Sequence, residues 1–169
     1  ENMHYPVDGT ALNFYAYYPY EAGTDPTAMI FGVKDDQNQS GMYDISDLLL
    51  SQAENQTRTE VNLQFSHALS LIQVEVVRGK NMPAFDSSLK ATLLNCFPSG
   101  DVDLVGGTAT VRNIAEQEIV MHKIETGSST VYNYRALVPA QIIETGVDLF
   151  SFVQATTGKE INLKYTTEP

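Results

Sequence analysis

The amino-acid sequence predicts an all-β domain, on two observations. Apolar and polar residues alternate with period two along most of the chain, and no long stretch has the i, i+3, i+4, i+7 apolar spacing of an amphipathic helix. Turn-forming stretches such as PSGD, TGSS and TTGKE separate the alternating runs at short intervals. Short strands spaced in this way are typical of a β-sandwich or a β-barrel.

The first strand is predicted in LNFYAYYPY, residues 12–20, where five aromatic rings occupy nine positions. One face carries Leu12, Phe14, Ala16 and Tyr18, and the other carries Asn13, Tyr15 and Tyr17. Both faces are rich in apolar or aromatic groups, which indicates a central strand covered on both sides, and Pro19 ends the ladder. Exposed tyrosines also stack on sugars, but the alternation and the lack of Trp favour core packing.

Seven further strands are predicted by the same alternation. They span residues 28–33, 90–96, 101–105, 108–113, 130–139, 148–155 and 160–165. The segment 43–54 has two interpretations, because Ser46 is a good cap for a short helix while the DLLL run suits a buried strand.

One long run, residues 61–77, changes its phase in the middle. Apolar residues occupy odd positions from 61 to 71, except at His67, and then even positions from 72 to 76. A slip of one residue is produced by a β-bulge or by a bend between two sheets.

The same phases select core residues. We expect Phe14, Phe65 and Leu69 to be buried, since they lie in phase on strongly β-patterned runs. His67 falls in the apolar phase as well, and we interpret it as a core or bulge histidine hydrogen-bonded to backbone, with a ligand or catalytic role as the alternative.

The size and charge of the chain bound its function. Its 169 residues suit one domain over 1–169, and its formal charge of −11 repels nucleic-acid phosphates and anionic lipid, so we expect no nucleic-acid partner. No run approaches the roughly 20 apolar residues of a membrane span. The chain begins at Glu1 without a signal-peptide pattern, so we expect a processed or fragmentary form that lacks the precursor's N-terminal segment.

One loop matches a calcium-binding template. Positions 1, 3, 5, 6, 9 and 12 of the template fall on Asp36, Asn38, Ser40, Gly41, Asp44 and Asp47. The last position holds Asp in place of the longer Glu, and no amphipathic helices flank the loop. We therefore favour a plain surface turn over a calcium site.

Catalytic motifs are absent from the sequence. It contains no G-x-S-x-G, H-E-x-x-H, C-x-x-C or phosphate-binding loop, and His4, His67 and His122 are far apart. Cys96 is the lone cysteine, in the apolar stretch ATLLNCF, where it is expected to be a small buried hydrophobe. We expect no catalytic, cofactor-binding or metal-binding residues, no cofactor and no enzymatic activity.

Three ordered motifs nevertheless resemble a known family. The stretches YPVDGTALNFYAYYPY, DDQNQSGMYDISDLLLSQAE and VNLQFSHALSLIQVEVV resemble the fimbrillin-like proteins of Bacteroidales, in which a YP-x-DG…FYAYYP strand precedes a DQS…YDLL-x-A segment and an L-x-F-x-HALS-x-I strand. The later YRALVPAQ and TGKEINLKY are similar to the closing strands of such a domain. A signal peptide, a lipobox cysteine and the strands that usually precede these motifs are not in this sequence.

The resemblance implies a transthyretin-like Greek-key β-sandwich in an adhesive or structural subunit of a fimbria (pilus). It implies export to the cell surface, usually as a lipoprotein of the outer membrane. The partners would be other fimbrial subunits or copies of the chain, joined by strand exchange after proteolysis removes a terminal strand. A host or bacterial surface ligand is a further implied partner. The rival interpretation is a carbohydrate-binding surface module of a Bacteroidales glycan-uptake system.

Overall fold

The computed structural model describes residues 5–57, 60–81 and 86–166, and these are almost entirely β-structure. Thirteen strands and one short helix, α1 (Met42–Ile45), make up the elements of the described chain. All strand pairs are antiparallel. The predicted all-β sandwich class is confirmed, while its transthyretin-like Greek-key topology stays a prediction.

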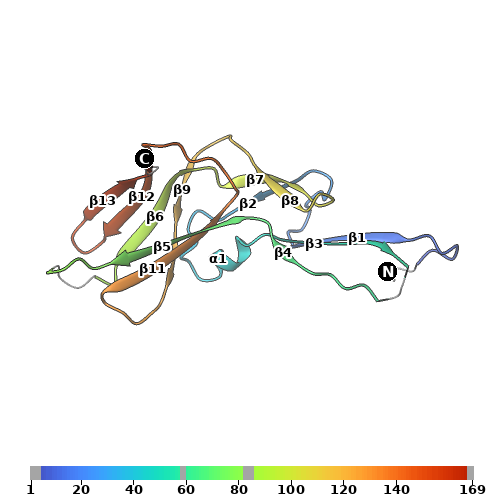
Figure 1. Cartoon of the computed structure of the whole chain (residues 1–169), viewed down its shortest axis with the longest axis horizontal. Helices are drawn as coiled ribbons and strands as arrows, with labels where there is room; N and C mark the ends of the chain where they lie inside the picture. Colours follow the sequence, from blue (N-terminus) through green and yellow to red (C-terminus); the bar gives the residue numbers. More distant parts are fainter. Residues whose placement is uncertain (1–4, 58–59, 82–85, 167–169) are drawn as a thin grey trace.

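Two sheets enclose the main core (Figure 1). The first has the order β13 (Lys159–Lys164), β12 (Asp148–Gln154), β6 (Leu89–Cys96) and β9 (Gln117–Val120), and the second has the order β10 (His122–Ile124), β11 (Val131–Val138) and β5 (Ser70–Val77). The chain crosses between them at Met121. This residue is buried, and its N–H donates to the Ala91 carbonyl of β6 at 2.9 Å.

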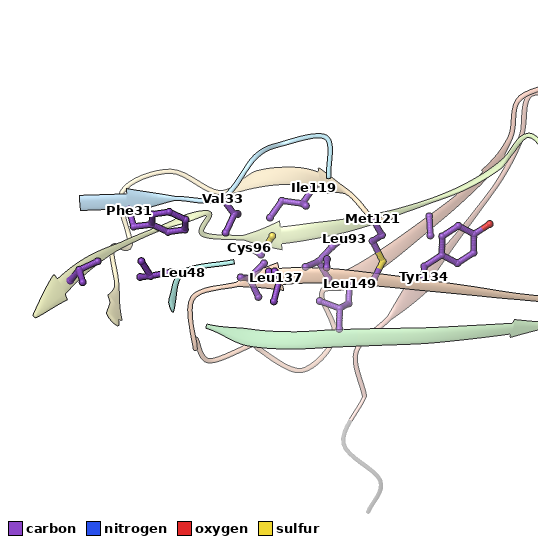
Figure 2. Close-up of a cluster of buried hydrophobic side chains, with 14 of the residues drawn as sticks. Phe31, Val33, Leu48, Leu93, Cys96, Ile119, Met121, Tyr134, Leu137 and Leu149 are labelled. Carbon is purple, nitrogen blue, oxygen red and sulfur yellow. The ribbon is translucent and has the colours of Figure 1, made fainter. Parts of the chain in front are cut away.

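The core residues of β6 and much of β11 lie at alternate positions, as a sandwich requires, while Phe31 of β2, Val33 and Leu48 extend the same core beyond the two sheets (Figure 2). Ala91 and Leu93 of β6 are fully buried, together with Tyr134 and Ala136 of β11. The Tyr134 hydroxyl donates to the Leu89 carbonyl at 2.8 Å, which ties the two sheets together and satisfies the one polar atom of this buried ring.

Two smaller sheets extend the molecule. One has the order β2 (Met29–Gly32), β7 (Ser99–Asp103), β8 (Thr108–Val111), and the other has the order β1 (Leu12–Tyr18), β3 (Leu49–Gln56), β4 (Ser66–His67). The second of these, which we call the arm, projects away from the sandwich and gives the molecule its elongated shape (Figure 1).

Most strands lie where the alternation predicts them. The eight predicted strands outside the 43–77 region are all present within one or two residues at each end. Both interpretations of 43–54 hold in part, because α1 is followed directly by β3, although Ser46 ends the helix instead of starting it. The short strands β9 and β10 were not predicted, because the apolar residues Ile119, Val120 and Met121 are consecutive and give no run of alternation.

The run 61–77 is not one strand, so this prediction is wrong. Residues 61–65 form no strand, β4 pairs with β3 in the arm, and β5 pairs with β11 in the sandwich. The chain therefore passes between two sheets within this run, at residues 68 and 69, which lie a few residues before the phase change inside β5.

The break in this run also corrects the predicted core. Phe65 is 44% exposed, since it lies before β4 on a segment without strand pairing, and Phe14 is only half-buried on the arm. Leu69 is partly buried and packs against the core cluster.

Candidate interaction surface

The aromatic stretch forms β1, which is an edge strand of the arm. It pairs with β3 alone among the described strands, so the expectation of a central strand covered on both sides is wrong. Tyr15 and Tyr17 pack partly against the core, whereas Tyr18 and Tyr20 are 45% and 77% exposed. Two tyrosines of the stretch therefore contribute to the core, and the two near its end lie on the surface.

Two contacts orient the tyrosine rings. The Tyr15 hydroxyl donates to the Glu54 carboxylate on β3 at 3.0 Å, and this hydrogen bond to a negative group raises the pKa of Tyr15. The rings of Tyr17 and Tyr20 lie 6.5 Å apart, tilted by 31°. The arm thus presents an aromatic surface next to a carboxylate.

The second edge of the arm is incompletely paired. β4 covers β3 only at Leu49 and Leu50, and in the described part of the chain no strand pairs with β3 beyond them on that side. Continuing this register places Phe65 opposite Ser51, whose hydroxyl is buried without a hydrogen-bond partner. Phe65 is 44% exposed and directly precedes β4, so it lies where the pairing of this edge stops.

The acidic loop uses its oxygens to hold its own fold. Asp36 accepts hydrogen bonds from the Asn38 backbone N–H at 3.0 Å and the Gln39 amide at 3.1 Å. Asn38 in turn accepts from the Lys123 N–H of β10 at 2.9 Å. Within the described residues no group of three or more His, Cys, Asp or Glu is placed to hold a metal ion. The preference for a plain turn over a calcium site stays a prediction.

His67 is not a core histidine. Its side chain is 71% exposed, and Nδ1 lies 2.8 Å from the Asp47 carboxylate. The residue sits on the two-residue strand β4 at the edge of the arm, where neither face is covered, so the apolar phase gave the wrong position. This contact joins the last position of the acidic loop to the arm.

The other two histidines of the sequence are His122 and His4. His122 stacks on the Tyr43 ring of α1 with centroids 5.1 Å apart, and the Arg135 guanidinium lies 4.0 Å from the centroid of that ring. This stack holds α1 on β10 and β11. His4 lies outside the described residues.

Cys96 is the small buried hydrophobe that its surroundings indicate. It is 1% exposed, its Sγ lies 3.5 Å from the Gln117 carbonyl, and burial raises the pKa of the thiol to about 12. A thiol with this pKa is a poor nucleophile at neutral pH.

A cavity of about 360 Å³ lies at the ends of β6, β9 and β12. It is lined by Leu94, Asn95, Glu116, Gln117, Glu118 and Asp148. The Asn95 amide spans part of it by donating to the Asp148 carbonyl at 2.7 Å.

Two glutamines that the sequence did not single out hold the loops in place. Gln37 is fully buried: its Nε2 donates to the Leu137 carbonyl at 2.8 Å, and its Oε1 accepts from the Leu137 N–H at 2.9 Å. Gln141 makes the same pair of bonds to the backbone of Phe97, at 2.8 and 3.1 Å. Each side-chain amide makes the two backbone hydrogen bonds that a neighbouring strand would otherwise make. The sequence gives no signal of this role, because a glutamine in a turn is usually exposed.

The comparisons agree with the motifs that the sequence presents. A family model described as fimbrillin-like matches residues 1–168, which is nearly the whole chain. No curated protein and no solved structure matches the chain. Among the described residues, the structure has no helix that is long and apolar enough to cross a membrane.

Proposed function

The chain belongs to the fimbrillin-like family, and on that premise we propose that it is a fimbrial subunit that assembles by strand exchange. Fimbrillin-like proteins are structural components of fimbriae at the cell surface, so the family supports a structural role. The proposal includes an exported precursor, lipid-anchored at the outer membrane of a Bacteroidales cell, and a single sandwich-type domain.

The open edge of β3 is the observation that supports assembly most directly. Beyond Leu50 its ladder groups that face away from β1 have no strand partner in the described part of the chain, and they offer hydrogen bonds to an extended segment of another subunit. Phe65, exposed beside this edge, offers an apolar contact that would set the register of the incoming segment. Ladder bonds supply affinity in this kind of recognition, and side-chain contacts supply specificity.

The test is a polymerisation assay with a matched pair of variants. Phe65→Arg places a charge beside the open edge, and Ile142→Arg places the same charge on a loop residue that is 92% exposed. We expect the first variant to lose the ladder of oligomers on size-exclusion chromatography and the second to keep it. Equal assembly by both variants, with unchanged circular dichroism, would exclude the β3 edge as the joint.

The exposed rings at the end of β1 favour a second candidate function, which is carbohydrate binding. Tyr20 is largely exposed and lies beside Tyr17, and tyrosine faces stack on sugar rings. Tyr20→Ala removes the exposed ring without touching the buried core, so a glycan array on the wild type and this variant would separate binding from folding. Equal signals from both proteins on every glycan would rule the rings out.

A further inference from the structure

The eight-residue strand β5 has a free edge of a kind that β-proteins usually protect. It lies at the end of the order β10, β11, β5, and no described strand pairs with its second side. Its register with β11 runs without a break from Ser70 to Val77, and the strand contains no proline and no lysine. Long edges without such protection invite pairing with another strand.

Other long edges of the molecule carry features that oppose such pairing. β13 has lysines at both ends, Lys159 and Lys164, and lysines on an edge strand discourage association. β1 has a register break between Leu12 and Phe14 and is followed by Pro19. Among the described strands, β5 is thus a long edge without these safeguards, as is the open part of β3 proposed above as the assembly joint.

The hydrogen-bond pattern fixes which backbone groups face outward on β5. The Arg78 N–H donates to the Thr130 carbonyl at 2.8 Å, in register with the β5–β11 pairs. Because hydrogen-bonded pairs alternate along an antiparallel ladder, the even-numbered residues of β5 bond to β11. The N–H and C=O groups of Leu71, Gln73, Glu75 and Val77 therefore point to the open side.

We propose that this edge pairs antiparallel with β5 of a second copy of the chain, about a two-fold axis at Val74. In this register Leu71 of one copy lies opposite Val77 of the other, and Gln73 lies opposite Glu75. Every outward N–H and C=O of the strand gains a partner, since odd residues meet odd residues.

The side chains complement each other in the same register. Leu71 and Val77 are 51% and 60% exposed in the single chain, and the pairing brings them into contact across the axis. The charged Glu75 faces a neutral amide, so no like charges lie directly opposite. A second copy of the chain is therefore a sufficient partner for this edge, because β5 is complementary to itself in the antiparallel register.

The resulting assembly is closed, since an isologous contact uses the same patch on both copies. It goes beyond the proposed function, because strand exchange at the arm joins subunits through a different edge. Such a small contact predicts weak association, and the charge of −11 on each copy predicts that added salt strengthens it.

Analytical ultracentrifugation of the chain up to about millimolar concentration tests the proposal. We expect a reversible monomer–dimer equilibrium. The double variant Leu71→Lys with Val77→Lys sets like charges opposite each other and should weaken the dimer about tenfold or more. Leu71→Lys with Val77→Glu sets opposite charges together and should restore it. Both positions are exposed, so neither double variant disturbs the core.

Amide hydrogen exchange gives an independent readout of the same register. The amides of Gln73 and Glu75 should slow as concentration rises, whereas those of Ile72 and Val74, already bonded to β11, should not change. A chain that stays monomeric, an association that both double variants affect alike, or open-ended growth would overturn the proposal. None of these results bears on assembly through the β3 edge, which the Phe65→Arg variant tests separately.

Discussion

Replacing Gln37 with leucine removes a buried amide that makes both backbone hydrogen bonds to Leu137. The substitution keeps the approximate size of the side chain but leaves the Leu137 N–H and C=O without partners in the core. Each buried backbone group left unsatisfied costs about 1 to 3 kcal/mol, so the expected loss is about 2 to 6 kcal/mol. Because domains are stable by about 5 to 15 kcal/mol, this single change should remove a large part of the folding free energy.

Urea denaturation of the Gln37→Leu variant measures the loss. The matched control is Gln39→Leu, since Gln39 is exposed and its side-chain amide donates to the exposed Asp36 carboxylate at 3.1 Å, and the cost of this change should stay within about 0.5 kcal/mol. A loss below about 0.5 kcal/mol for Gln37→Leu as well would refute the role of this side chain as a backbone partner.

A second variant separates hydrogen bonding from packing at the same site. In Gln37→Glu the carboxylate faces the Leu137 carbonyl, and burial raises the pKa of the new acid above its unfolded value of about 4.3. The native state then binds more protons than the unfolded state, so the free energy of unfolding should rise as pH falls from 7 toward 5. A variant whose deficit relative to wild type is independent of pH would contradict the proposed pair of bonds.

Three further predictions concern the core, the acidic loop and one carboxylate. Leu93→Ala should lower the free energy of unfolding by about 2 to 5 kcal/mol in urea denaturation, because Leu93 is fully buried. Phe65→Ala should lower it clearly less, because much of the Phe65 ring lies in solvent. Equal losses for the two variants would contradict the corrected core. Excess chelator should leave the Tm unaltered, and a calcium-dependent rise in Tm that Asp36→Ala abolishes would show that the loop binds the ion. Hydrogen bonds from the Ser88 backbone N–H and the Thr156 hydroxyl lower the pKa of Asp86 to about 2, so its stabilising effect should be complete above the unfolded pKa of about 4 and be lost as pH falls toward 2. Asp86→Asn should flatten this part of the acid-unfolding curve, and an unchanged curve would exclude the contribution.

The strands were predictable where one face of a sheet is buried. Alternation located β11 and β12 because their inward residues, such as Tyr134 and Phe152, repeat with period two. The same signal failed at 61–65, where apolar residues alternate but the chain forms no ladder. A period of two shows only that the residues suit a strand. Whether a second strand lies alongside to pair with them depends on the topology of the fold.

The interaction surfaces were less predictable than the fold. Nothing in the sequence near Gln37 or Gln141 marks them as partners of Leu137 and Phe97, because those backbones are distant in sequence. The free edge of β5 likewise follows from the order of strands, which local pattern does not determine. The motifs around Phe14 and His67 did identify the family, although both side chains lie elsewhere than their periodicity indicates.

The most direct test of the proposed fimbrial role is immunogold electron microscopy of cells that express the full precursor. Antibodies raised against this chain should label filaments that extend from the cell surface, at regular intervals for a stalk subunit or at one end for a tip or anchor subunit. Cells that lack the gene, rescued with the Phe65→Arg variant, should lose labelled filaments and keep the folded protein. Label confined to the cell body, with filaments unlabelled in the wild type, would contradict a role as a fimbrial subunit.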